Sequence, residues 1–158
     1  MSGAAQEISW RFVAFEALTA PELYALLQLR SEVFVVEQAC IFQDMDGADA
    51  QAMHLLGTLA GQLVAYARCF AAGIQFAEAC IGRVATRQLV RGSGVGHVLL
   101  QQALVRLQLQ WGPQAVRIGA QARLEHFYRQ HGFVEAGAPY IEDGITHIEM
   151  LRPALVQT

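Results

Sequence analysis

The stretch "VRGSGVGHVLL", residues 90–100, places three glycines directly before an apolar segment with helical spacing. The first backbone N–H groups of a helix have no intrahelical partners, and the helix dipole adds positive potential there. Small residues at this point let a phosphate group approach the backbone, so the stretch indicates an anion site at a helix start. A plain glycine-rich turn is the alternative that the glycines alone leave open.

Two familiar phosphate motifs do not fit this stretch. A dinucleotide fingerprint requires G-x-G-x-x-G, and after Gly92 and Gly94 the third glycine would fall at position 97, which is His97. A P-loop requires Gly-Lys-Ser/Thr, and all eleven basic residues of this chain are arginine. What remains is Arg91 followed by glycines three and five positions later.

Regular elements are expected on both sides of the glycine stretch. Apolar residues recur at helical spacing through residues 94–111. Upstream, Thr19 and Glu22 form a capping-box pattern that starts a helix, and Gly61 marks the turn of a hairpin. The order β-α-β-β-β-α-β-α-β-β predicts one α/β domain, residues 1–158, with a mixed sheet. Strands are expected at 8–15, on both sides of Gly61 within 54–70, at 79–86, 115–120, 133–140 and 145–151, with a short helix at 123–132.

The composition excludes several classes of protein. With 158 residues, 54% of them hydrophobic, the chain is long enough for one domain with a substantial core. Its net charge of −3 argues against nucleic acid as a partner. No apolar run reaches the roughly 18 residues of a membrane helix. The opening "MSGAAQEISW" lacks an export signal, so we expect a cytoplasmic protein with no membrane partner.

The cysteines and histidines form no metal-site pattern. Cys40, Cys69 and Cys80 lie in unrelated contexts without a CxxC, which indicates neither disulfides nor a zinc site. His126 and His131 are five residues apart and therefore point to different faces of a helix. We expect no metal.

Several longer segments carry a family likeness. The pattern "RGSGVG" after "IGRVAT" resembles the acyl-coenzyme A signature of the GCN5-related N-acetyltransferase (GNAT) superfamily, and "AQARLEHFYRQHGF" resembles its second signature. "LYALLQLRSEVFVVEQ", "FQDMDGAD", "HLLG" and "YIEDGITHIEM" are similar to the ElaA-type group within it. Ile41 and Thr146 depart from that group, where proline would be expected. The likeness covers nearly the whole chain.

The resemblance implies a fold and a co-substrate. The fold is a mixed, mostly antiparallel sheet with helices on both faces, in which acetyl-coenzyme A lies between two splayed central strands, here 81–86 and 115–120. Main-chain groups of Val84, Ala85 and Thr86 would bind its pantetheine arm, as a strand extends a sheet edge. The residues that would hold its pyrophosphate are Arg91, Gly92, Ser93, Gly94, Val95, Gly96 and His97.

The resemblance also places Tyr128 near the thioester sulfur. A phenol is matched to protonating a departing thiolate, so Tyr128 is a candidate general acid. Spacing alone favours a simpler role, because Leu124, Phe127, Tyr128 and His131 share one helical stripe and fit a core aromatic.

The likeness places four base candidates near the acceptor cleft: Glu37, Glu142, Asp143 and His147. Imidazole titrates in the useful pH range, and a carboxylate can act through water. The alternatives are a solvated "EDG" turn for the two acids and an ordinary strand histidine for His147. The run that includes Asp44, Asp46 and Asp49 fits a solvated loop, or a cleft lining that attracts a cationic amine.

Two functions stay open on this basis. One is an acetyl-CoA-dependent N-acetyltransferase that acts on a primary amine of a small molecule or peptide by direct attack on the thioester. The other is a binding module that holds acyl-CoA to regulate a partner without turnover. Tyr128 and the acidic loop favour the enzyme, and a homodimer is compatible with either function.

Overall fold

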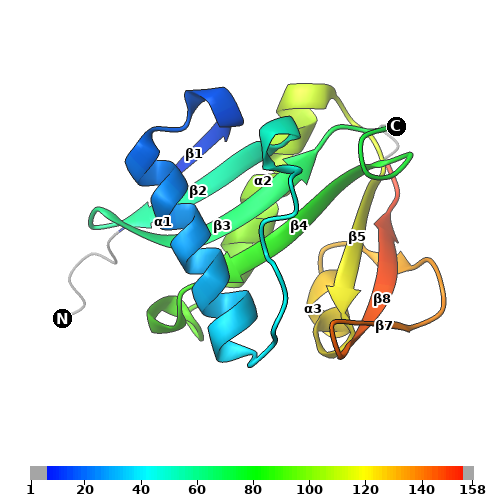
Figure 1. The fold of residues 1–158 in the computed structure, drawn as a ribbon. Coiled ribbons are helices and arrows are strands. Elements are labelled where there is room, and N and C mark those ends of the chain that lie inside the picture. The colour runs from blue at the N-terminus through cyan, green and yellow to red at the C-terminus, as the bar shows by residue number, and fades with distance from the viewer. Residues whose placement is uncertain (1–6, 155–158) are drawn as a thin grey trace.

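A single mixed sheet of eight strands forms the centre of the molecule (Figure 1). The computed structural model describes residues 7–154, so the ends of the expected 1–158 domain and the first six residues of "MSGAAQEISW" lie outside it. The strand order is β1-β2-β3-β4-β5-β8-β6, with β7 also paired to β8. Only β4 and β5 are parallel neighbours. The strands are β1 Ser9–Ala14, β2 Met53–Leu59, β3 Gln62–Phe70, β4 Ala79–Thr86, β5 Val116–Gln121, β6 Val134–Glu135, β7 Tyr140–Glu142 and β8 Ile145–Arg152.

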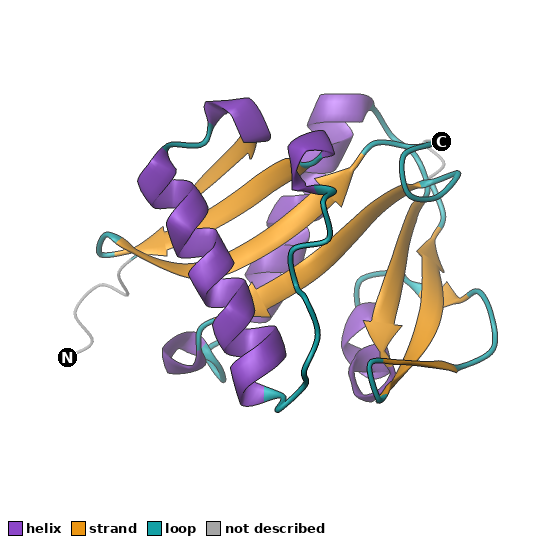
Figure 2. Cartoon of the chain, viewed as in Figure 1, coloured by secondary structure: helices purple, strands orange, loops and turns teal. Residues whose placement is uncertain are grey.

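Helices cover both faces of this sheet, which confirms the expected α/β fold (Figure 2). The helix α1 (Ala20–Arg30) lies on one face, and α2 (Val95–Trp111) lies on the other. Each packs on its own apolar cluster, the larger one beneath α2 and a smaller one beneath α1. The short helix α3 (Glu125–Arg129) follows β5. Among residues 7–154, no helix has both the length and the apolar character that crossing a bilayer requires.

The start of α1 follows the capping pattern in the sequence. The Thr19 side chain accepts a hydrogen bond from the backbone N–H of Glu22, and the Glu22 carboxylate accepts one from the backbone N–H of Thr19. The helix then continues as a π-helical segment, η2 (Ser31–Glu37), before the chain enters the acidic loop. This wider segment carries Glu37 to the edge of the splayed strands, where it lines the cavity described below.

The central strands separate after two paired residues. The parallel ladder between β4 and β5 contains only Ala79 with Val116 and Cys80 with Arg117. On its other edge β4 stays paired with β3, but the register shifts there, and Arg83 takes a left-handed backbone conformation with a φ of 50°. An extra residue of this kind bends a strand and increases its twist. The expected splayed pair is therefore present, and Figure 1 shows β4 and β5 diverging from their paired ends.

The tail differs from its expected form. One strand was expected at 133–140, but the structure has two short strands, β6 and β7, separated by residues 136–139. This interval contains Gly137 and Pro139, and proline cannot donate to a strand ladder. Both strands pair with β8, which also pairs with β5. The β7–β8 turn is thereby placed beside the splayed strands.

Candidate functional site

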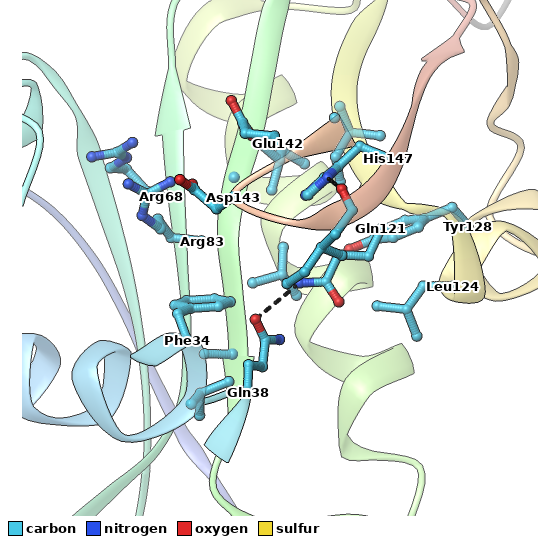
Figure 3. Close-up of a pocket in the computed structure, with 18 of the residues that line it drawn as sticks. Phe34, Gln38, Arg68, Arg83, Gln121, Leu124, Tyr128, Glu142, Asp143 and His147 are labelled. Atoms are coloured by element: carbon cyan, nitrogen blue, oxygen red, sulfur yellow. Dashed lines mark hydrogen bonds between the residues drawn. The ribbon is translucent and has the colours of Figure 1, made fainter. Parts of the chain in front are cut away.

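A cavity of about 930 Å³ occupies the gap between β4 and β5 (Figure 3). Its walls come from η2, the loop that follows it, β3, β4, β5, α3 and the β7–β8 hairpin. Strand alternation sorts these residues between the two faces of the sheet. Ile118, Ala120, Ile148 and Met150 belong to the cluster beneath α2, so their strand neighbours Gly119, Gln121, His147 and Glu149 face the α1 side.

Tyr128 lines the cavity on the α2 side. Its ring is buried, and Phe127 and Phe133 pack edge-on against it. Burial raises the pKa of Tyr128 to about 12, so its hydroxyl keeps its proton at neutral pH. The side chain therefore combines a core position with a place on the cavity wall, as Figure 3 shows. The core position expected from its helical stripe is confirmed, and the general-acid role stays a prediction.

Within residues 7–154, the edge of β4 that faces β5 has no strand partner beyond Cys80. Val84, Ala85 and Thr86 line the cavity along this edge. An extended chain can add to such an edge by main-chain hydrogen bonds. These residues therefore fit the pantetheine arm that the resemblance implies, although the Thr86 carbonyl already accepts two hydrogen bonds from Arg91, at 2.6 and 3.1 Å.

The glycine stretch has the shape that an anion site requires. Gly92 and Gly94 have φ values of 83° and 85°, and a Cβ added at either position would meet no atom within 4 Å. Helix α2 begins at Val95, and no side chain caps its first N–H groups. The loop therefore fits a pyrophosphate through its open backbone. Of the seven residues expected to hold one, Arg91 and Gly96 line the cavity.

The side chains at the two ends of this loop, Arg91 and His97, already have partners. The Arg91 guanidinium lies 2.7 Å from the Glu37 carboxylate, which pairs this base candidate with a cation. His97 Nδ1 lies 2.8 Å from His131 Nε2, and both rings pack against Phe127. Burial and the neighbouring His97 lower the pKa of His131. Glu37 therefore lines the cavity as half of an ion pair.

The acidic loop differs from both of its interpretations. The loop aspartates, Asp44, Asp46 and Asp49, form an ion network with Arg30, Arg68 and Arg83, in which the shortest N···O distance of each aspartate is 2.7 to 2.8 Å. Asp44 is buried between Arg30 and Arg83 and does not line the cavity. Asp46 does line it, but the hydrogen bond from Arg68 holds its pKa well below the usual range. Asp44 and Asp49 are largely shielded from solvent, and the more exposed Asp46 is bound by Arg68.

His147 is oriented by the backbone of its own strand. Its Nδ1 lies 2.7 Å from the carbonyl oxygen of Ile145, and because a carbonyl only accepts, Nδ1 carries the proton. The other nitrogen, Nε2, is then the basic one in the neutral ring. The ring stacks on Tyr140 with the centroids 5.6 Å apart. His147 therefore lines the cavity with a free lone pair in a fixed orientation.

The hairpin acids, Glu142, Asp143 and Glu149, also line the cavity. Glu142 and Asp143 are exposed at the β7–β8 turn, and the Cys40 thiol donates a hydrogen bond to the Asp143 carbonyl at 3.1 Å. Sequence reasoning missed Glu149, which lies in β8 two residues after His147. Glu149 belongs to the quoted motif "YIEDGITHIEM", which could have drawn attention to it. That it shares a face with His147 follows only once this segment is known to be a strand, because alternate residues of a strand point to the same side.

One neutral contact joins the two sides of the cavity. The Gln121 side-chain amide of β5 donates a hydrogen bond to the Gln38 amide oxygen at 3.3 Å (Figure 3).

Within the described chain, His, Cys, Asp and Glu side chains form no group of three or more that would hold a metal ion. His126 contacts Gln130, and His131 contacts His97, so these two histidines lie in separate pairs.

Comparisons with known proteins agree with this geometry. Residues 21–152 match the family model of the acetyltransferase (GNAT) domain. The chain is 41% identical over 150 residues to protein ElaA of Escherichia coli K12, covering 94% of this chain and 98% of ElaA. The crystal structure of E. coli ElaA superposes with a TM-score of 0.86 at 41% identity, over 92% of this chain and 99% of that one. An acyl-CoA N-acyltransferase structure from Pseudomonas aeruginosa gives a TM-score of 0.89 at 42% identity, with the same coverage. The chain belongs to the GNAT acetyltransferase family and is similar to its ElaA proteins.

Proposed function

We propose that the protein is an acetyl-CoA-dependent N-acetyltransferase that transfers acetyl to a primary amine of a small molecule or peptide by direct attack on the thioester. The observation that carries this proposal is the cavity between β4 and β5, which joins an unpaired strand edge to Tyr128 on one face and His147 on the other. Family membership supports the acyl-transfer chemistry. Acetyl as the acyl group and an amine as its acceptor are part of the proposal.

The residues of this chain divide the binding of acetyl-CoA between them. Main-chain groups of Val84 and Ala85 bind the pantetheine arm, and the N–H groups that begin α2 bind the pyrophosphate. When bound, acetyl-CoA supplies the thioester, whose C–S bond breaks as the C–N bond to the amine forms. Gly92 and Gly94 keep the phosphate approach clear of side chains.

Two side chains manage the protons. The amine must lose one proton before it can attack, and His147 Nε2 is oriented to accept a proton directly or through one water. Tyr128 holds a proton at neutral pH and donates it to the departing sulfur. A second proton leaves the amine nitrogen as the amide forms, and it restores the phenol. In sum an ammonium and a thioester yield an amide, a thiol and one released proton.

A screen of amines for release of coenzyme A thiol tests this proposal. The purified protein is incubated with acetyl-CoA and a panel of small amines and peptides, and free thiol is measured against a sample without acceptor. We expect release that depends on one class of amine and falls sharply in the Tyr128→Phe variant.

A calorimetric titration with acetyl-CoA, run in parallel, separates the enzyme from the binding module. Binding without amine-dependent thiol release across the panel would favour an acyl-CoA-binding regulatory module. Absence of binding at millimolar ligand would exclude both functions.

A further inference from the structure

We propose that the α1 side of the cavity recognises an ammonium group on a substrate that carries no carboxylate, and that Glu149 binds this ammonium. The inference rests on the proposed function, because it specifies the acceptor of that reaction. It concerns a residue to which the proposed proton transfers give no role.

One carboxylate oxygen of Glu149 lacks a hydrogen-bond partner among the described residues. Its side chain projects from β8 toward the α1 side, opposite Gly119 in the register with β5. Its Oε2 atom is buried and makes no hydrogen bond within residues 7–154. Burial, first of all, raises the pKa of this carboxyl group. A buried oxygen in this condition gains a hydrogen bond and a compensating charge if a cationic donor reaches it.

The one nearby cation does not meet this need. Arg117 Nη1 lies 3.8 Å from Glu149 Oε2, which is beyond hydrogen-bond distance. The same guanidinium is committed to Glu78, with Nε at 2.9 Å and Nη2 at 3.4 Å from the Glu78 oxygens. Arg117 therefore lies at the edge of the site without closing it, and a ligand ammonium can complete the coordination of Glu149.

The cations on this face are mostly engaged. Arg68 and Arg83, which line the cavity, are both bound by the loop aspartates, although the buried Arg68 Nε makes no hydrogen bond within residues 7–154. Arg123 lines the cavity without a carboxylate partner among the described residues, but it follows β5, and its charge acts on Tyr128. A carboxylate beside the amine would instead meet Glu142 and Asp143 at the rim. The charges thus select an amine over an amino acid.

Two aromatic rings, Phe76 and Tyr140, line the same cavity as Glu149. The Phe76 ring lies under the Arg117 guanidinium, 5.8 Å from its carbon, and the Tyr140 ring stacks on His147. A Cβ at Gly119 would come within 2.9 Å of the Tyr140 hydroxyl, so glycine at this position keeps the ring over the strand. Ring faces suit the carbon chain next to an ammonium. An arylalkyl or alkyl monoamine has the matching chemistry.

Three probes that share the phenylethyl skeleton test this selectivity on the wild-type protein. 2-Phenylethylamine carries the ammonium, 2-phenylethanol replaces it with a neutral hydroxyl, and phenylalanine adds a carboxylate. Binding is measured by calorimetry with coenzyme A present and no acetyl donor, so no turnover occurs. We expect 2-phenylethylamine to bind about tenfold or more tightly than the other two probes. Equal binding of the three, tighter binding of phenylalanine or no binding by 2-phenylethylamine would overturn the proposal.

Glu149→Gln identifies the residue, with Glu142→Gln as the matched control. Both changes remove one carboxylate from the cavity lining, but Glu142 is exposed. We expect Glu149→Gln to abolish the preference for the amine over the alcohol and Glu142→Gln to retain most of it. The reverse result, or equal effects, would contradict the assignment. Melting curves show whether each variant is folded, and if Glu149→Gln is not, Glu149→Ala and the wild-type probe series decide.

The outcome is separable from that of the proposed function. If the wild type prefers the amine probe but releases no thiol from acetyl-CoA with any amine, the function is wrong and the ammonium site stands. If it acetylates amino acids while binding the three probes equally, the function stands and the ammonium site is wrong.

Discussion

The loop aspartates and the hairpin acids are both small sets of acidic residues beside one cavity, but only the loop aspartates form close ion pairs with arginine. Each loop aspartate lies within 3 Å of an arginine nitrogen, whereas the nearest arginine to Glu149 is 3.8 Å away. The arginines of the loop set come from α1, β3 and β4, and are separated from it by 14 to 39 residues. The first set stabilises the fold, and the second is available to a ligand. Local sequence does not distinguish them, because the partners are distant.

The largest effect is expected on breaking the ion network. Arg30 is fully buried and bonds to Asp44 and Asp49, so Arg30→Met leaves two desolvated carboxylates with one partner fewer. We expect the free energy of unfolding to fall by about 3 kcal/mol, measured by urea denaturation. Arg11→Met is the control, because its pair with Glu22 is half exposed and should contribute under about 1 kcal/mol. If both variants lose a similarly small amount of unfolding free energy, the network contributes no more to stability than an exposed ion pair.

Tyr128→Phe should affect catalysis and leave stability nearly unchanged. The ring is buried, and its hydroxyl makes no hydrogen bond to the described residues, so its loss removes little folding energy. We expect kcat to fall about 100-fold with acetyl-CoA affinity retained, as for a general acid. Steady-state kinetics and a melting curve on one preparation check this. A lower melting temperature with unchanged kcat would assign Tyr128 to the core alone.

Two glycines of the glycine loop, Gly94 and Gly96, allow effects on folding to be distinguished from effects on ligand binding. Gly94 has a left-handed backbone, so Gly94→Ala should cost about 1–2 kcal/mol of stability. A Cβ at Gly96 would lie 3.6 Å from Phe127, which is ordinary contact, so Gly96→Ala should fold normally. We expect both variants to bind acetyl-CoA more weakly by calorimetry. Full affinity in the folded Gly96→Ala variant would place the phosphate elsewhere.

The smallest effect concerns pH and contrasts Glu149 with Asp46. The pKa of Glu149 is raised in the folded state, so its contribution to stability is lost as pH rises above about 4, the unfolded value. Glu149→Gln should therefore be more stable than wild type at pH 7, by about 1 kcal/mol or less, and equal to it near pH 4.

Asp46 should show the opposite sign. Its pKa is lowered by Arg68, so its stabilisation is present above about pH 4 and is lost as pH falls further. Asp46→Asn should be less stable than wild type at pH 7 and approach it in acid. Denaturation at both pH values checks the pair, and the same sign for both variants would remove the distinction between the two acidic sets.

Much of the fold follows from local sequence. The Thr19–Glu22 capping box, the turn at Gly61 and the glycine-marked start of α2 are each specified by residues a few positions apart. The splayed strands and the helices on both faces required the family resemblance. The division of 133–140 into two strands was not predicted, although Gly137 and Pro139 interrupt this segment.

The site was less predictable because its chemistry depends on contacts across the sheet. From the sequence, Glu37 is a candidate free carboxylate. In the structure it is paired with Arg91, which is 54 positions later in the chain. His147 acquires its tautomer from a carbonyl two residues away, but its place in the cavity comes from the pairing of β8 with β5. Glu149 resembles any alternating strand residue until the register shows what it faces.

The ion network also determines which wall of the cavity can move. Loop 42–49 has little regular structure, yet swinging it outward would break charged hydrogen bonds to three separate elements at once. Such an opening belongs to the slow, sub-global class, so we expect its amide hydrogens to exchange with the sheet rather than as a surface loop. The β7–β8 turn contacts the segment before this loop through the Cys40 thiol, which donates a hydrogen bond to the Asp143 carbonyl. We therefore expect the exposed tip of the hairpin to move on the faster time scale of loop motions while the acidic loop stays in place.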